Sequence, residues 1–222
     1  MSLKCHNGRM PRPSATMTSI FGRAVAKVVA PATVGPDVAR IYESALRVLS
    51  ERGTRAATMD DVATSSGVSR ATLFRKYGGK DALFEAAVAY TLRTFLAEIT
   101  TTFLTVTDPT ERIAEAFVAC LRLRRRLLTD EPDSVRSAEF LDMLTAGTPS
   151  ALEIGRRFIA ARIRAGQEEG TLPPGDPDLR ADAIIRLTVG YMLLPTTDLD
   201  DDSVARDLAR RVIAPLVTTP AS

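Results

Sequence analysis

Apolar residues recur every three or four positions along most of this chain, as they do on one face of an amphipathic helix. The first such run comprises Val38, Ile41, Tyr42, Ala45, Leu46 and Leu49. No segment alternates apolar and polar residues for long enough to favour a β-strand. The pattern therefore predicts an all-α fold of about nine helices.

Residues that start and stop helices divide the chain into these segments. Asp108 and Asp176 each precede a proline, which combines an N-cap acid with the residue preferred at the first helical position. Thr58 and Ser69 are N-cap candidates for two short helices, and each of these helices ends at a glycine. A long helix is predicted to follow, from residue 81 to about residue 103.

Charge and periodicity together divide the chain into three regions. Residues 1–36 are punctuated by prolines and carry a net charge of +5, which predicts a basic, flexible N-terminal tail. The net charge of residues 37–83 is +2, and that of residues 84–222 is −5. The last region contains five of the predicted helices and the end of the long one. A basic front end on an acidic body favours contact with a polyanion.

Composition excludes several classes of protein. With 45% hydrophobic and 25% charged residues, the 222-residue chain has the balance of a globular protein. A membrane span is not expected, because the sequence contains no apolar run of about 18 residues. The two cysteines, Cys5 and Cys120, are too few for a disulfide framework and favour the cytoplasm. The only histidine is His6, so His-based triads and His-ligated zinc are not expected in the folded body. We therefore expect neither an enzyme nor a metal or cofactor site.

The most informative stretch is 58–83, where two short helices flank a glycine-containing turn in a helix-turn-helix arrangement. The second helix carries polar and basic residues between its core positions: Ser69, Arg70, Thr72, Arg75 and Lys76. Such a helix fits the major groove, where arginine pairs with guanine and threonine contacts the thymine methyl group. Lys80 precedes the next helix and suits a phosphate contact.

The string TMDDVATSSGVSRATLFRKYGGKDALF, residues 58–84, resembles the DNA-binding signature of the TetR family of bacterial transcriptional regulators. The resemblance covers about 47 residues when the preceding helix is included; the rest of the chain matches in helix count and in its two strong terminal helices. It implies an N-terminal three-helix DNA-binding domain, 37–83, and a C-terminal helical domain for effector binding and dimerisation, 84–222. It also implies a homodimer that binds a palindromic operator in double-stranded DNA, usually represses, and releases DNA when a small-molecule effector binds.

Carried over residue by residue, the resemblance implies phosphate contacts from Thr58 and Lys80, and base or backbone contacts from the second short helix. The expected DNA-binding set is Thr58, Ser69, Arg70, Thr72, Phe74, Arg75, Lys76, Tyr77 and Lys80. This chain departs from the family at two of these positions, because the family commonly has Tyr at position 74 and Phe at position 77. Phe74 has no hydroxyl group to donate to a phosphate.

Candidates for the other two sites lie in the helical body. Residues that could line an effector cavity are Phe95, Phe117, Cys120, Phe140, Met143 and Phe158, although at helical spacing each is more simply part of the core. Their apolar character favours an apolar or aromatic effector. The helices expected at 177–194 and 203–216 are too apolar for solvent and predict a four-helix dimer bundle. Its interface candidates are Ile184, Leu187, Tyr191, Val204, Leu208 and Val212.

Two charged clusters have simpler explanations. The arginines at 122 and 124–126 are expected to form a solvated face rather than to capture a ligand or to contact DNA. The acidic cluster between Asp198 and Asp202 is expected to cap the last helix rather than to bind a cation.

Together these features predict a ligand-responsive transcriptional regulator of the bacterial cytoplasm, associated with the nucleoid when bound to DNA. Two alternatives remain open at this point. One is a ligand-binding protein of the same fold without sequence-specific DNA binding, and the other, more remote, is an all-α enzyme.

Overall fold

The structure, a computed structural model, describes residues 16–26, 34–128, 134–194 and 197–220. Over these ranges it is helical and contains no strand, which confirms the predicted all-α fold. The α-helices are α1 (Met17–Ala26), α2 (Pro36–Ala56), α3 (Met59–Ser66), α4 (Arg70–Tyr77), α5 (Lys80–Thr105), α6 (Pro109–Leu127), α7 (Ser134–Thr145), α8 (Ala151–Glu168), α9 (Pro177–Leu193), α10 (Asp202–Leu208) and α11 (Pro215–Thr218). A 3-10 turn (Thr197–Asp200) precedes α10, and a π-helical turn (Ala209–Ile213) follows it.

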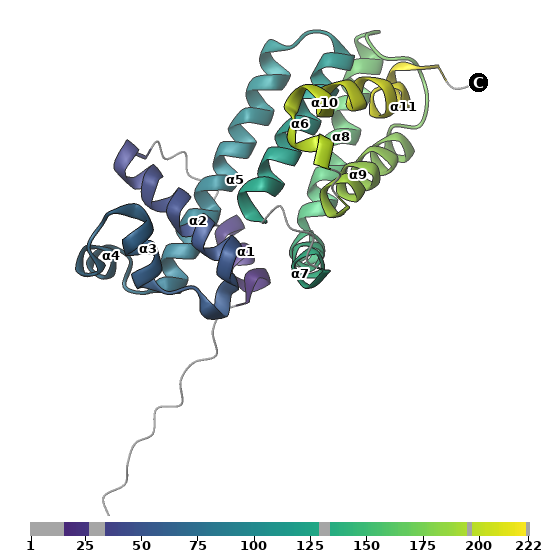
Figure 1. Cartoon of the computed structure of the whole chain (residues 1–222). Helices are drawn as coiled ribbons and strands as arrows, with labels where there is room; N and C mark the ends of the chain where they lie inside the picture. The colour runs from purple at the N-terminus through teal and green to yellow at the C-terminus, as the bar shows by residue number, and fades with distance from the viewer. Residues whose placement is uncertain (1–15, 27–33, 129–133, 195–196, 221–222) are drawn as a thin grey trace, which may run out of the picture.

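Helix α5 joins the two parts of the molecule. Its 26 residues span about 39 Å, from the group formed by α2, α3 and α4 to the far end of the C-terminal body (Figure 1). Near its start, Leu83 and Phe84 are fully buried against the N-terminal helices. Along its length α5 packs against α6, so the N-terminal domain and the body share one continuous element.

The predicted flexible tail over 1–36 is wrong for residues 17–26, which form helix α1. Ile20, Phe21 and Ala24 are buried, and α1 packs against both α5 and α7. The exposed Arg23 side chain pairs with the buried Glu85 carboxylate of α5 at 2.9 Å. Three apolar residues on one face are enough to anchor this helix, although the helical spacing of apolar residues in the sequence continues for only two turns. Residues 1–15 and 27–33 of the predicted tail lie outside the described residues.

The predicted last helix, 203–216, is interrupted. Pro215 has no backbone N–H, and its ring would clash with the carbonyl group four residues earlier. The chain accommodates it with a π-helical turn, in which the Ala214 N–H donates to the Ala209 carbonyl oxygen at 2.8 Å. The helix then continues as α11.

Salt bridges hold α6 against α10 and the π-helical turn in antiparallel register. Glu111 pairs with Arg210, Glu115 pairs with Arg206, and Arg122 and Arg125 both pair with Asp202. Arg124 of the same basic run is buried. The expectation of a solvated arginine face was therefore wrong for Arg122 and Arg125, which pair with α10, and for the buried Arg124, but it holds for Arg126, which is exposed. The neighbouring Asp201 caps α10, as predicted for the acidic cluster.

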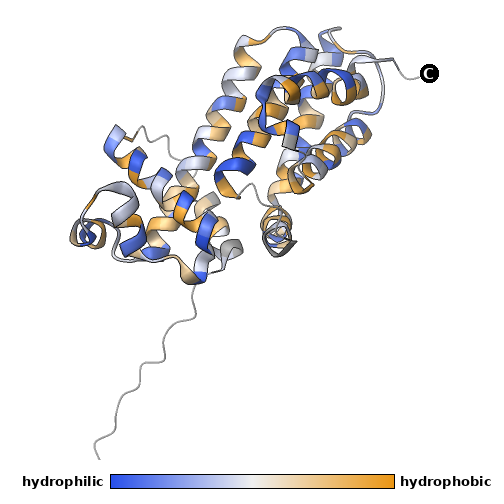
Figure 2. Ribbon diagram, in the orientation of Figure 1, coloured by the Kyte–Doolittle hydropathy of each residue, from blue (hydrophilic) through white to orange (hydrophobic). Residues whose placement is uncertain are grey.

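The remaining helices complete a body in which α8 packs against α9 and α6 contacts both α5 and α9. Hydrophobic and hydrophilic residues alternate along α5 and α6, as expected for helices that are only partly buried (Figure 2). The predicted N-caps Asp108 and Asp176 both accept backbone hydrogen bonds from the first turns of α6 and α9. Among the described helices, none is both long and apolar enough to span a bilayer.

Candidate nucleic-acid interface

Helices α3 and α4 form the predicted helix-turn-helix, and local capping fixes both of them. The Thr58 hydroxyl accepts a hydrogen bond from the Asp61 N–H at 3.2 Å, and the Asp61 carboxylate accepts from the Thr58 N–H at 3.0 Å. This reciprocal pair is a capping box at the start of α3. Hydrogen bonds from Thr58 lower the pKa of the Asp61 carboxyl group, so it stays ionised at neutral pH. The turn between the helices lies at Gly67, with a left-handed φ of +70° that favours glycine.

The N-terminus of α4 is exposed and polar. Ser69 caps it by accepting a hydrogen bond from the Thr72 N–H at 3.2 Å, and the two hydroxyl groups lie 2.9 Å apart. The core side of the same helix is fixed by Leu73, which is fully buried. The first turn of α4 therefore presents hydroxyl groups to solvent on a rigidly packed helix.

Arg70 and Phe74 form one exposed unit on α4. The Arg70 guanidinium lies 5.2 Å from the centroid of the Phe74 ring and donates to the Asp60 carboxylate of α3 at 2.8 Å. Arg70 and Asp60 are each 60% exposed, so solvent screens this ion pair and it is weak. The guanidinium can therefore exchange Asp60 for another acceptor at low cost.

Two further cations extend this surface along α4. Arg75 and Lys76 are both exposed, and the Lys76 ammonium lies 5.5 Å from the centroid of the Tyr77 ring. With Ser69, Arg70, Thr72 and Phe74 they make up what we call the α4 face.

Tyr77, which the sequence analysis included in the DNA-binding set, is half-buried and packs against the core, so a DNA contact from it stays a prediction. Its ring packs against Tyr42 of α2 with centroids 6.1 Å apart, and Tyr42 in turn packs against Tyr90 of α5 at 5.4 Å. Its hydroxyl group is buried, with no hydrogen-bond partner in the described part of the chain. Burial raises the pKa of this hydroxyl group well above its usual range. The aromatic stack fixes the angle between α4, α2 and α5.

Lys80 is engaged within the domain. Its ammonium group donates to the carbonyl oxygens of Thr54, Arg55 and Ala57 at 3.1, 3.3 and 3.1 Å. These carbonyl groups follow the kink of α2 at Gly53 and have no helical partners of their own. A phosphate contact from Lys80 stays a prediction and would have to compete with these bonds. The predicted phosphate contact of Thr58 would likewise have to share its hydroxyl group with the capping box.

Two arginines that we did not select from the sequence brace α2 against α3. Arg52 pairs with Asp61 at 3.0 Å, and Arg47 donates to the Ser65 hydroxyl at 2.6 Å. Both lie on the polar side of an amphipathic helix, where the sequence offers no signal that separates a bracing arginine from a solvated one.

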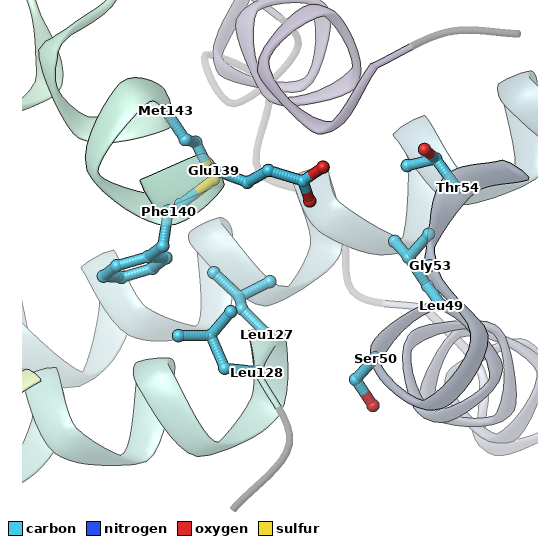
Figure 3. Close-up of a pocket in the computed structure, with 9 residues that line it drawn as sticks. All are labelled: Leu49, Ser50, Gly53, Thr54, Leu127, Leu128, Glu139, Phe140 and Met143. Atoms are coloured by element: carbon cyan, nitrogen blue, oxygen red, sulfur yellow. The ribbon is translucent and has the colours of Figure 1, made fainter. Parts of the chain in front are cut away.

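The predicted effector residues do not converge on one cavity among the described residues. Phe140 and Met143 of α7 do line a pocket with the ends of α2 and α6, where the Phe140 ring faces Leu127 and Leu128 (Figure 3). Its volume is about 20 Å³, enough for one water molecule and no more. This pocket is therefore closed to an effector in this conformation.

The other four candidates lie elsewhere. Phe117 is buried, Phe95 is half-buried, and Phe158 is exposed with its ring 5.2 Å from Phe103. Cys120 packs beside the core, and burial raises the pKa of its thiol to about 12, so it carries no thiolate at neutral pH. The simpler interpretation as core residues holds for Phe117 and Cys120.

The predicted dimer residues separate into two groups. Ile184 is buried, Tyr191 packs edge-on against Phe117 with ring centroids 5.7 Å apart, and Leu208 contacts the core. These three side chains therefore pack within their own chain. Leu187 of α9, Val204 of α10 and Val212 of the π-helical turn are exposed. We call these last three residues the outer apolar group.

Comparison with known proteins shows which proteins this arrangement resembles. Residues 41–87 match the bacterial regulatory proteins of the tetR family. An uncharacterized HTH-type transcriptional regulator of Mycobacterium tuberculosis H37Rv is 29% identical over 186 residues, which cover 82% of this chain and 86% of that protein.

Solved structures share the fold. A TetR-like regulator from Rhodococcus sp. RHA1 aligns with a TM-score of 0.59 at 18% identity, over 83% of this chain and 97% of that one. The fatty acid degradation regulator FadR from Bacillus halodurans gives 0.60 at 17% identity, over 83% and 96%. The ketosteroid regulator KstR2 of M. tuberculosis gives 0.56 at 20% identity, over 84% and 97%. Over residues 41–87 the chain is therefore similar to the tetR family of bacterial regulatory proteins, its curated relative is named a transcriptional regulator, and it shares the fold of solved TetR-like regulators over most of its length.

Proposed function

We propose that the protein is a repressor that binds a palindromic operator as a homodimer through the α4 face and leaves DNA when a small molecule binds its helical body. The observation that carries this proposal is the combination of exposed Arg70, Arg75 and Lys76 with a fully buried Leu73 on one short helix. The cations are exposed and can meet DNA, while the core residue holds the helix in place. A helix that presents base-reading side chains in this way fits the major groove.

Arg70 is the side chain best suited to read a base. Its weak, exposed contact with Asp60 can be replaced by the O6 and N7 atoms of guanine, which accept a bidentate arginine. The Phe74 ring lies against the guanidinium and limits its freedom. A partly exposed Phe74 can also contact a thymine methyl group, which would replace the phosphate contact of the family's tyrosine.

Homodimerisation is supported by the outer apolar group. Val204 and Val212 are 42% and 43% exposed, because the opposite side of α10 and of the π-helical turn faces α6 through salt bridges. Exposed apolar side chains two turns apart on one side of a helix favour burial against a second copy. Such a dimer would present two α4 helices to successive turns of one face of the DNA.

The experiment that tests the operator proposal is fluorescence anisotropy of the full chain with the DNA that flanks its own gene, against random DNA, at two salt concentrations. We expect affinities that differ by about a thousandfold and fall with salt. The double variant Arg70→Ala, Lys76→Ala should lose this preference, while Arg157→Ala, an exposed arginine of α8, should keep it.

Equal, weak binding to both DNAs, followed by failure of a selection from random sequences, would contradict the proposal. That outcome would favour a ligand-binding protein that keeps the fold without reading DNA.

A further inference from the structure

A second and larger cavity lies where the DNA-binding domain meets the body. Its volume is about 340 Å³, and it opens between α2, α5 and α6. Small-molecule sites in proteins begin at about 300 Å³, so this cavity can hold a compact ligand. None of the six effector residues predicted from the sequence lines it.

Among the described residues, the cavity lining carries more positive than negative charge. Three arginines line it, Arg47 from α2 and Arg125 and Arg126 from α6, against a single carboxylate, Glu43. Asp202 already neutralises Arg125 at 2.7 Å. Arg47 donates only to the neutral hydroxyl of Ser65, and exposed Arg126 has no ion-pair partner among the described residues.

The other lining groups restrict what can enter. The Ser50 and Thr94 hydroxyl groups donate to carbonyl oxygens of their own helices, at 2.9 and 3.0 Å, so their protons are not available to a ligand. Apart from the hydroxyl group of Thr91, which also lines the cavity, the donors left to a ligand are mainly guanidinium groups, which prefer carboxylates and phosphates. Leu46 and the Tyr90 ring supply an apolar wall beside them.

We propose that this cavity binds a small organic anion, in which a carboxylate or phosphate group lies between Arg47 and Arg126 and a compact apolar group lies against Tyr90. Because Arg47 belongs to the helix-turn-helix domain and Arg126 to the body, the bound anion ties α2 to the end of α6. Its consequence for DNA affinity rests on the proposed function, whereas the binding itself does not.

The binding test uses the full chain with benzoate and phenyl phosphate as anionic probes and benzyl alcohol as the neutral control. Calorimetric titration and thermal unfolding should show saturable binding and a raised Tm with at least one anion, weakened by added salt, and neither effect with benzyl alcohol. The anion that binds with the higher affinity shows whether the site prefers a carboxylate or a phosphate group.

The variant Arg126→Gln should weaken this binding about tenfold or more. Arg126 is exposed and has no ion-pair partner among the described residues, so its replacement should leave folding intact. Arg157→Gln makes the same change in net charge at an exposed arginine of α8 and should bind the anion as the wild type does. Absence of saturable anion binding, equal binding of benzyl alcohol, or unchanged affinity in Arg126→Gln would each overturn the site.

The regulatory consequence is measured separately, by anisotropy with operator DNA. The anion should change the DNA affinity of the wild type and leave that of Arg126→Gln almost unchanged; an equal change in both proteins would show that the effect arises elsewhere. By linkage, DNA should change the affinity for the anion by the same factor. If no DNA is bound at all, the proposed function fails, while the anion titration still decides the site.

Discussion

At the scale of single residues, Lys80 stabilises the fold in a way that its position in the sequence does not reveal. Its ammonium group serves three carbonyl oxygens at the end of α2. We expect Lys80→Ala to lower the free energy of unfolding by about 1–3 kcal/mol, because the half-buried carbonyl oxygens of Thr54 and Ala57 lose their donor. Lys76→Ala, at an exposed position, should change it by less than about 0.5 kcal/mol. Urea denaturation of both variants checks the difference, and equal stabilities would show that water replaces the ammonium group without cost.

Arg70 carries the second prediction at this scale. If it pairs with guanine in bidentate fashion, Arg70→Ala should weaken binding to the operator by about 1–3 kcal/mol and leave binding to random DNA nearly unchanged. Competition anisotropy with both DNAs measures the two losses. An equal loss on both would instead make Arg70 a phosphate contact.

At the scale of elements, α1 is held in the fold by the buried side chains of Ile20, Phe21 and Ala24. Ile20 is fully buried, so Ile20→Ala should lower the free energy of unfolding by about 2–5 kcal/mol. Gly22→Ala, on the same helix but exposed with no atom near the added methyl group, should stabilise it by about 0.5–1 kcal/mol. Thermal denaturation distinguishes the two directions. No loss in Ile20→Ala would mean that α1 contributes nothing to the stability of the domain.

A pH dependence follows from the contact between α6 and α10. Burial alone would raise the pKa of Asp202, but hydrogen bonds from Arg125 and Arg122 outweigh it and hold the pKa below its ordinary value of 3.8. The stabilisation is therefore complete above that value and is lost as the pH falls through the lower folded-state pKa. We expect the wild type to exceed Asp202→Asn in stability by about 1 kcal/mol at neutral pH, and the gap to close in acid. Denaturation at a series of pH values measures it; a constant gap would contradict the assignment.

The elements that sequence analysis predicted best are those that local chemistry determines. Thr58, Ser69, Asp108 and Asp176 all act as N-caps, because a side chain two or three residues from a free N–H needs no tertiary contact to reach it. Helix α1 was missed because its stability comes from α5 and α7, which lie far away along the chain.

The same distinction holds for the candidate site. The exposed cations of α4 could be identified from their spacing on one short helix. The bonds of Lys80 and the burial of Tyr77 could not, because they depend on where α2 ends and on which side of α4 it lies. The cavity between α2, α5 and α6 likewise brings together residues from three helices, and no local pattern joins them.

At the scale of the whole molecule, the outer apolar group makes a prediction about assembly. If the protein forms the proposed dimer, Val204→Asp should convert it into a monomer, because the carboxylate would lie unpaired in the interface. Its exposure means that the single chain should still fold. Leu141→Asp, at a similarly exposed position on α7, should remain dimeric. Sedimentation velocity reports the outcome, and a dimeric Val204→Asp would exclude this interface.

Dimerisation would also set the geometry of DNA binding. Two α4 helices on one face of the duplex must lie about 34–36 Å apart, one helical turn of DNA. Since α5 is continuous from the helix-turn-helix domain into the body, a ligand that tilts it would change this separation. Such a ligand acts only to the extent that it binds the two arrangements with different affinity.

The scarcity of lysine gives the interface a natural chemical reporter. In the described part of the chain Lys76 and Lys80 are the only lysines, at either end of the turn that follows α4, and Lys4 and Lys27 lie outside it. Within the described part of the chain, an amine-selective acylating reagent therefore modifies lysine side chains at the DNA-binding end alone. Lys76 is exposed and should react quickly, whereas Lys80 is held by three carbonyl groups and should react slowly. Mass spectrometry of the modified peptides, with and without DNA, would then footprint α4 without any introduced label.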